Sequence, residues 1–244
     1  MLNTIEHGTP DLPPLLIAHG LFGSGRNWGV IGKRLSDSYH VICPDMRNHG
    51  DSPWFDSHGY PDMAGDLADL LDGPTDVVGH SMGGKAAMML ALSRPELVKR
   101  LVVADIAPVA YTHTQSHNID AMRAVDLSGI TRRSEAADRL DVGDDVKSFL
   151  LQSLDAGEKR WKLNLDVLDR EMYKIIGWPD VSGRFDGPTL FLSGGQSDYV
   201  QPDYRDRIKT LFPNARFAKI PDAGHWLHAE KPRDFEKTLR VFLD

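Results

Sequence analysis

A serine at position 81 lies in a sequence pattern that can make its hydroxyl a nucleophile. The pattern is G-x-S-x-G, present as "GHSMG" (79–83), and the run "TDVVGHS" (75–81) that leads into it predicts a buried strand. The following run, "MGGKAAMMLALSRP", predicts a helix that ends before Pro95. So tight a turn between strand and helix strains the serine and raises its hydroxyl above the sheet, beside the free N–H groups of the helix. We therefore predict that Ser81 is a catalytic nucleophile.

A histidine near the C-terminus can supply the base, which a serine hydroxyl needs to become a strong nucleophile. His225 follows the apolar run "ARFAKIPDAG" (215–224), so it is expected at the C-terminal end of a strand, at the same edge as Ser81. His228 could form a metal-binding pair with it, but no carboxylate or cysteine cluster accompanies them. We predict His225 as the general base and no metal site.

Two backbone N–H groups are expected to stabilise an oxyanion formed at the serine. Met82 opens the predicted helix, so its N–H points to the place where the oxyanion would form. The run "LLIAHGLFGS" (15–24) predicts a strand that ends at His19-Gly20, where the chain turns over the sheet. We expect the N–H of Leu21 to point to the same place, with His19 bracing the loop.

Strand-like and helix-like runs alternate along the first part of the chain, which predicts a parallel sheet with helices on both faces. From about residue 111 to 183 no Val/Ile-rich run appears, and the alternation resumes at "GPTLFLSGG" (187–195). A helical block of that length is too long for an ordinary crossover. We predict an α/β core of residues 1–110 and 184–244, with a helical cap of residues 111–183 inserted after the strand that carries Asp105.

Composition and charge limit the kinds of molecule that the protein is expected to bind. The chain has 244 residues, of which 41% are hydrophobic and 26% charged, and a formal net charge of −7 at pH 7. This charge argues against nucleic acid or an anionic membrane as the main partner, and no apolar window is long enough to span a bilayer. The single cysteine, Cys43, allows no intrachain disulfide, and the N-terminal residues lack a signal-peptide pattern. We expect a cytoplasmic monomer or homodimer that acts on a small molecule without a cofactor.

Five motifs together carry a family resemblance: "HGLFGS", "DMRNHGDSP", "GHSMGG", "ADIAP" and "AGHWLHAEKP". They resemble the α/β-hydrolase superfamily and, more narrowly, its small capped serine esterases of the YbfF type, from about residue 14 to the C-terminus. The resemblance implies a mostly parallel sheet of about eight strands, a helical cap, a serine–acid–histidine order and hydrolysis of short- to medium-chain acyl esters or thioesters. The residues before position 14 leave room for one short strand, so the usual opening antiparallel pair is expected to be shortened.

Two aspartates follow strands from which they could orient His225. Asp198 follows the strand predicted in 187–195, the placement found in most of the superfamily. Asp105 follows the strand after the nucleophile's helix, the placement that the resemblance to YbfF-type esterases implies. Two ionised carboxylates beside one imidazole would repel each other, so we expect only one of them to bond to the histidine. We favour Asp105, which a stiff Ile-Ala-Pro segment follows, and keep Asp198 as the alternative.

Four aromatic residues near these loops are predicted to line a substrate pocket: Phe22, Trp28, Tyr199 and Trp226. The leading hypothesis is a carboxylesterase or acyl thioesterase that forms an acyl-enzyme on Ser81. Two alternatives stay open, because a fold does not determine a function. The same side chains could cleave carbon–carbon bonds or carry out perhydrolysis, or they could belong to a small-molecule receptor with little turnover.

Overall fold

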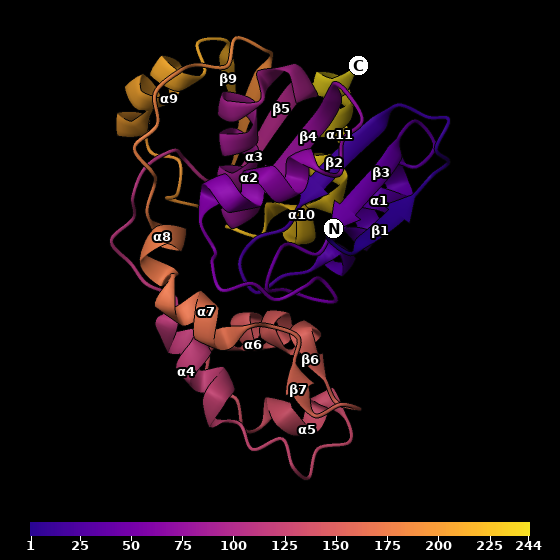
Figure 1. Cartoon of the computed structure of the whole chain (residues 1–244), viewed down its shortest axis with the longest axis vertical. Helices are drawn as coiled ribbons and strands as arrows, with labels where there is room; N and C mark the ends of the chain where they lie inside the picture. Colours follow the sequence, from indigo (N-terminus) through magenta and orange to yellow (C-terminus); the bar gives the residue numbers. More distant parts are fainter.

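A twisted sheet of seven strands forms the centre of the larger part of the protein (Figure 1). The computed structural model describes all residues, 1–244. In sheet order the strands are β1 (Thr4–His7), β3 (His40–Pro44), β2 (Pro14–Ala18), β4 (Thr75–His80), β5 (Val98–Ala104), β8 (Thr189–Gly194) and β9 (Ala215–Ile220). Only β1 runs antiparallel to its neighbour. The resemblance implies about eight strands, and the sheet has seven because the chain before β2 supplies a single short one.

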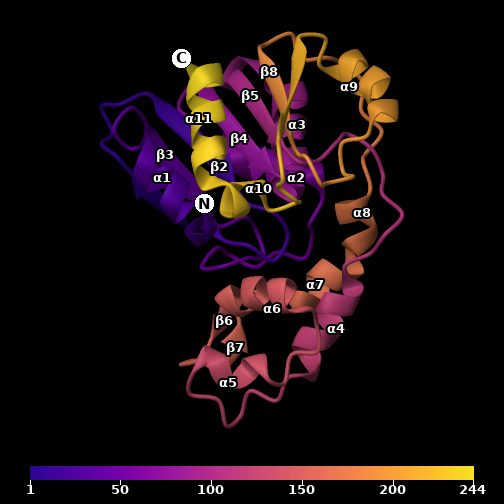
Figure 2. The same cartoon turned by 180° about the vertical axis from the view of Figure 1, so that it is seen from behind.

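Helices cover both faces of the sheet and create two apolar cores. On one face lie α1 (Gly29–Leu35), α10 (Leu227–Glu230) and α11 (Pro232–Leu243), and on the other lie α2 (Tyr60–Ala68), α3 (Met82–Ser93) and α9 (Arg205–Leu211). Leu15 and Ile17 of β2 pack with the first set, and Leu16 between them packs with the second, as the two-residue period of a strand requires. Figure 2 shows α11 lying along the face that is turned away in Figure 1.

The segment between β5 and β8 forms a smaller helical region below the sheet (Figure 1). It contains α4 (Ser116–Ala124), α5 (Arg133–Ala137), α6 (Asp144–Leu150), α7 (Leu165–Arg170) and α8 (Met172–Ile176), with a hairpin of β6 (Leu154–Asp155) and β7 (Arg160–Trp161). We call residues 111–183 the cap segment. Short 3₁₀ turns lie at Gly25–Trp28, Pro95–Leu97, Leu151–Ser153 and Pro202–Tyr204. None of the helices combines the length and the apolar character that crossing a bilayer demands.

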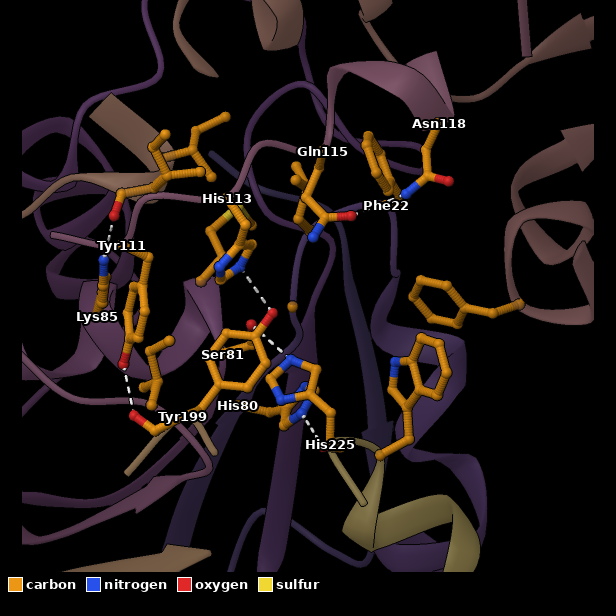
Figure 3. A pocket seen from close by; sticks show the side chains of 18 of the residues that line it. Phe22, His80, Ser81, Lys85, Tyr111, His113, Gln115, Asn118, Tyr199 and His225 are labelled. Carbon is orange, nitrogen blue, oxygen red and sulfur yellow. Dashed lines mark hydrogen bonds between the residues drawn. The ribbon is translucent and has the colours of Figure 1, made fainter. Parts of the chain in front are cut away.

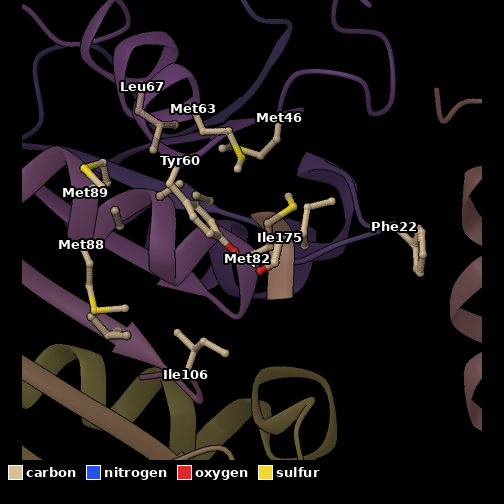
Figure 4. Packing of buried hydrophobic residues seen from close by; sticks show 14 of the residues in the cluster. Phe22, Met46, Tyr60, Met63, Leu67, Met82, Met88, Met89, Ile106 and Ile175 are labelled. Carbon is tan, nitrogen blue, oxygen red and sulfur yellow. Dashed lines mark hydrogen bonds between the residues drawn. The ribbon is translucent and has the colours of Figure 1, made fainter. Parts of the chain in front are cut away.

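Backbone hydrogen bonds and apolar packing join the cap segment to the rest of the molecule. The Gly50 N–H donates to the Lys162 carbonyl at 2.8 Å, which ties the loop after β3 to the cap segment. At the far end of the segment, Ile175 belongs to the same apolar core as Tyr60 and Met82 (Figure 4). The end of the cap segment is therefore packed directly against α2 and the start of α3.

Strand register determines which residues meet at the edge of the sheet. In the parallel pair β4–β5, His80 lies opposite Ala104, so the residues that follow them, Ser81 and Asp105, leave the sheet at the same level. In the next pair, β5–β8, Ala104 lies opposite Leu192. The loops after β4, β5 and β8 consequently share one edge of the sheet.

Candidate active site

Ser81 occupies the turn between β4 and α3 with a backbone conformation that residues other than glycine rarely adopt, φ 53° and ψ −119°. Glycines on either side make so tight a turn possible. A Cβ atom on Gly79 would lie 2.3 Å from the carbonyl oxygen of Gly83, and one on Gly83 would lie 2.5 Å from that of Ala18. The strained turn predicted from the sequence is therefore present, and it lifts Ser81 out of the plane of β4.

The imidazole of His225 contacts both Ser81 and Asp105. Its Nε2 lies 3.0 Å from the Ser81 Oγ, and its Nδ1 lies 2.7 Å from Oδ2 of Asp105. Figure 3 shows His225 and Ser81 side by side in the wall of a pocket. A carboxylate can only accept from Nδ1, so in this arrangement Nδ1 carries the proton and Nε2 presents a lone pair to the hydroxyl. The geometry allows His225 to take the proton of Ser81.

Asp105 is fully buried, and its carboxylate accepts three hydrogen bonds. Besides bonding to His225, it accepts the Gly194 N–H at 3.0 Å on Oδ1 and the Ser197 hydroxyl at 2.5 Å on Oδ2. Both of these donors come from β8 and the loop that follows it. They fix the plane of the carboxylate so that Oδ2 faces the imidazole. Ser197 was missed by sequence reasoning, although it lies next to the alternative acid in the motif "GGQSD".

Asp198 lies apart from this cluster. Its side chain is exposed and makes no hydrogen bond, and only its backbone carbonyl is engaged, by Nε2 of Gln201 at 2.6 Å. Of the two aspartates considered from the sequence, the structure brings only Asp105 to His225.

Two further side chains hold His225 in place. The ring of Tyr199 stacks on the imidazole with 4.1 Å between centroids, and its hydroxyl bonds to Nε2 of His113 at 2.9 Å. From below, Nε2 of His80 lies 2.8 Å from the backbone carbonyl of His225. Burial keeps the pKa of His80 well below its ordinary value, so His80 is neutral and its Nε2–H donates to that carbonyl. The His225 loop is therefore fixed through its backbone as well as its ring.

Two buried histidines brace the loop that follows β2. Nδ1–H of His19 donates to the Gly20 carbonyl at 2.7 Å, while its Nε2 accepts the Met46 N–H at 2.9 Å. Nε2 of His49 accepts the Phe22 N–H at 3.1 Å. Burial lowers the pKa of both imidazoles, which keeps a lone pair available on each accepting nitrogen. The bracing role expected of His19 thus has a partner in His49, which sequence reasoning missed.

The N–H groups of Leu21 and Met82 are placed where an oxyanion could be bound. Both residues line the same cavity as Ser81. The Leu21 N–H has no hydrogen-bond partner within the protein, and Met82 begins α3, where the first N–H groups have no intrahelical acceptor. A Cβ atom on Gly20 would lie 3.2 Å from the Ser81 Cβ, so the absence of a side chain there brings the loop close to the serine.

A cavity of about 260 Å³ opens over Ser81 and is lined mainly by hydrophobic side chains from both the core and the cap segment. Among the residues predicted to line a pocket, Phe22, Tyr199 and Trp226 do so. Phe149 of the cap segment packs near Trp226, with 5.5 Å between ring centroids. No Asp or Glu side chain lines the cavity, and the one lysine in its wall, Lys85, donates to two backbone carbonyls of the protein, which suits an uncharged, partly apolar ligand.

Trp28 does not line this cavity, contrary to the prediction from the sequence. Its side chain is fully buried on the opposite face of the sheet, where it stacks on His228 with 4.3 Å between ring centroids and packs against Phe235 of α11. Trp28 ends a 3₁₀ turn that leads straight into α1, and its indole packs in the same core as Ile31 and Leu35 of that helix. A large aromatic residue near a loop can pack in a core as readily as it can line a pocket, and the local sequence does not distinguish these two positions.

Comparisons with known proteins agree with this geometry. A family model described as "Alpha/beta hydrolase family" matches residues 15–238. The chain belongs to the α/β hydrolase family. The hydrolase is 42% identical over 254 residues to the "sn-1-specific diacylglycerol lipase ABHD11" of Mus musculus, covering 97% of this chain and 82% of that protein. It is 41% identical over 240 residues to "Esterase YbfF" of Escherichia coli (strain K12), covering 95% and 93%.

Among solved structures, the hydrolase is similar to one titled "Marine microorganism esterase", with a TM-score of 0.93 and 36% sequence identity over 99% of this chain and 98% of that one. Together these relatives confirm the predicted fold, the likeness to YbfF-type esterases and the prediction of an enzyme that hydrolyses ester bonds.

Proposed function

We propose that this hydrolase cleaves short- to medium-chain acyl esters through an acyl-enzyme on Ser81. The observation that carries the proposal is the unbroken contact from Asp105 through His225 to Ser81. His225 takes the hydroxyl proton as the serine oxygen attacks the ester carbonyl, and Asp105 stabilises the imidazolium that forms. The N–H groups of Leu21 and Met82 stabilise the oxyanion of the tetrahedral intermediate.

In the proposed cycle the proton held by His225 passes to the leaving group. The tetrahedral intermediate collapses, the bond to the alcohol or thiol breaks, and that group departs with the proton while the acyl group stays on Ser81. Water then attacks the acyl-enzyme, with His225 again accepting the proton. The second intermediate releases the carboxylic acid and restores the serine hydroxyl.

The cavity supports the proposed substrate class. It holds about 260 Å³, its walls are largely apolar, and side chains of the cap segment such as Val146 and Phe149 form part of them. We propose that residues 111–183 act as a cap whose inner face binds the substrate chain. The printed names of the relatives, an esterase and a diacylglycerol lipase, are consistent with an acyl ester as substrate.

A partitioning experiment tests whether a common acyl-enzyme forms. Turnover of p-nitrophenyl butyrate, phenyl butyrate and a butyryl thioester would be measured with added methanol as a competing acceptor. Because one butyryl-Ser81 intermediate would serve all three substrates, the ratio of methyl butyrate to butyric acid is expected to be the same for each. Ratios that change with the leaving group, or no turnover of any of the three, would contradict the proposal. The second result would favour a receptor or carbon–carbon chemistry.

A further inference from the structure

A buried lysine lies one helical turn after Ser81, in the wall of the same cavity. Lys85 of α3 is 1% exposed, and no carboxylate lies within ion-pair distance of its ammonium group. Its Nζ donates to the backbone carbonyls of Ile176 at 3.0 Å and Gly177 at 2.5 Å. These carbonyls lie at the end of α8, the last helix of the cap segment. The lysine therefore joins the nucleophile's helix to the returning end of the cap (Figure 3).

Two tyrosines complete the surroundings of the ammonium group. Nζ of Lys85 lies 4.8 Å from the ring centroid of Tyr111 and 5.6 Å from that of Tyr60. The Tyr60 hydroxyl donates to the Ile175 carbonyl, and the Tyr111 N–H donates to the Ile176 carbonyl at 2.9 Å. Three consecutive carbonyls at the end of α8 are thus held by this cluster, and Lys85 alone binds two of them.

The position of Lys85 is costly for a charged side chain. Burial lowers the pKa of its amine to about 7, and the groups that face it are neutral tyrosines and backbone carbonyls. An unbranched apolar side chain of similar length would occupy the site without the cost of desolvating an ammonium ion. What the ammonium adds is its pair of charge-assisted hydrogen bonds to the cap segment.

The residues that this lysine holds form part of the cavity wall. Ile175 and Ile176 both line the cavity, and Figure 4 shows Ile175 beside Tyr60 and Met82. We propose that Lys85 is a positioning residue that sets the length of substrate chain the cavity accepts. Its hydrogen bonds to the carbonyls of Ile176 and Gly177 fix this wall of the cavity. The inference rests on the proposed esterase function and adds a determinant of substrate size.

The strength of the two hydrogen bonds from Lys85 is expected to fall as the pH rises. Below about pH 7 Lys85 is an ammonium ion, and it becomes a neutral amine as the pH rises through its lowered pKa. The neutral amine donates weaker hydrogen bonds and is no longer attracted to the tyrosine rings. The wall then loosens, and discrimination against long chains falls as the pH rises. Any effect of pH on the proton transfers at Ser81 is shared by both substrates, so it cancels in a ratio of kcat/KM values for two chain lengths.

The test measures kcat/KM for p-nitrophenyl decanoate divided by kcat/KM for p-nitrophenyl acetate, from pH 6 to 8.5. In the wild type we expect this ratio to rise about fivefold across the range, the difference between a charge-assisted and a neutral hydrogen bond. Lys85→Met should show the high ratio at every pH. Lys85→Arg, which stays charged throughout, should show the low ratio at every pH. Lys99→Met, at an exposed position of β5, is the matched control and should follow the wild type.

The inference would be overturned if the ratio in Lys85→Met or Lys85→Arg changed with pH as it does in the wild type. A wild-type ratio that does not change with pH would also overturn it. Thermal unfolding identifies any variant that fails to fold, and if Lys85→Met does so, the arginine variant still decides the question. Loss of all ester turnover in the wild type would instead contradict the proposed function. The two failures are therefore distinguishable.

Discussion

Replacing Ser81 with alanine is expected to lower kcat for p-nitrophenyl butyrate by about 10⁶-fold, the loss seen when the nucleophile of a serine hydrolase is removed. The physical reason is that His225 then has no hydroxyl to deprotonate, and no acyl-enzyme can form. A residual rate about 10³- to 10⁴-fold above that in water is expected, because the N–H groups that bind the oxyanion remain. The measurement is steady-state turnover at saturating substrate, with thermal unfolding to show that the variant is folded.

A matched control for this variant is Ser182→Ala, a serine on the surface that makes no hydrogen bond and does not line the cavity. It should retain wild-type kcat. If Ser81→Ala kept more than about 1% of the wild-type kcat, an acyl-enzyme on Ser81 would no longer explain the activity.

Asp105→Asn is expected to lower kcat by about 10⁴-fold, the loss known for the equivalent change in serine proteases. Three donors meet this carboxylate, from Gly194, Ser197 and His225. An amide offers only one acceptor oxygen, and the Gly194 N–H can only donate, so the oxygen stays toward Gly194 and the NH₂ group takes the place of Oδ2 beside Ser197 and His225. The imidazole then turns its lone pair to the amide, places its proton on Nε2 and can no longer act as a base toward Ser81.

Asp198→Asn is the matched comparison, because it makes the same chemical change at the other aspartate considered from the sequence. Its carboxylate is exposed and makes no hydrogen bond, so kcat is expected to stay within about twofold of the wild type. A large loss in Asp198→Asn with little change in Asp105→Asn would show that the proposed acid is wrong.

The positions of Ser81 and His225 beside each other could be predicted from the sequence, because local patterns place both residues at one edge of the sheet. A strained turn needs glycines at fixed positions around Ser81, and residues that follow parallel strands meet at one edge of the sheet. Which aspartate contacts His225 was harder to predict, since both aspartates come after strands. What separates them is three-dimensional: Asp105 directly follows β5, level with Ser81, whereas Asp198 lies further along an exposed loop after β8.

Other features depended on contacts between segments far apart in the chain. Ser197 reaches Asp105 only because β8 lies beside β5, and Trp28 is buried on the face of the sheet where α11, more than 200 residues further along the chain, supplies Phe235. Lys85 did leave a signal in the sequence, because it is the only charged residue in the apolar helix "MGGKAAMMLALS". A lysine inside a helix without a polar face indicates a buried cation, but its partners in the cap segment could not be read from the sequence.

Covalent labelling by a fluorophosphonate tests most directly whether this hydrolase works through Ser81. The intact mass of the treated protein should rise by one adduct per chain, and fragmentation of the labelled peptide should place that adduct on the Ser81 oxygen. Ser81→Ala should take up no label, and Asp105→Asn should react far more slowly than Asp198→Asn. An adduct on another residue, or an active enzyme that remains unlabelled, would contradict the proposed mechanism.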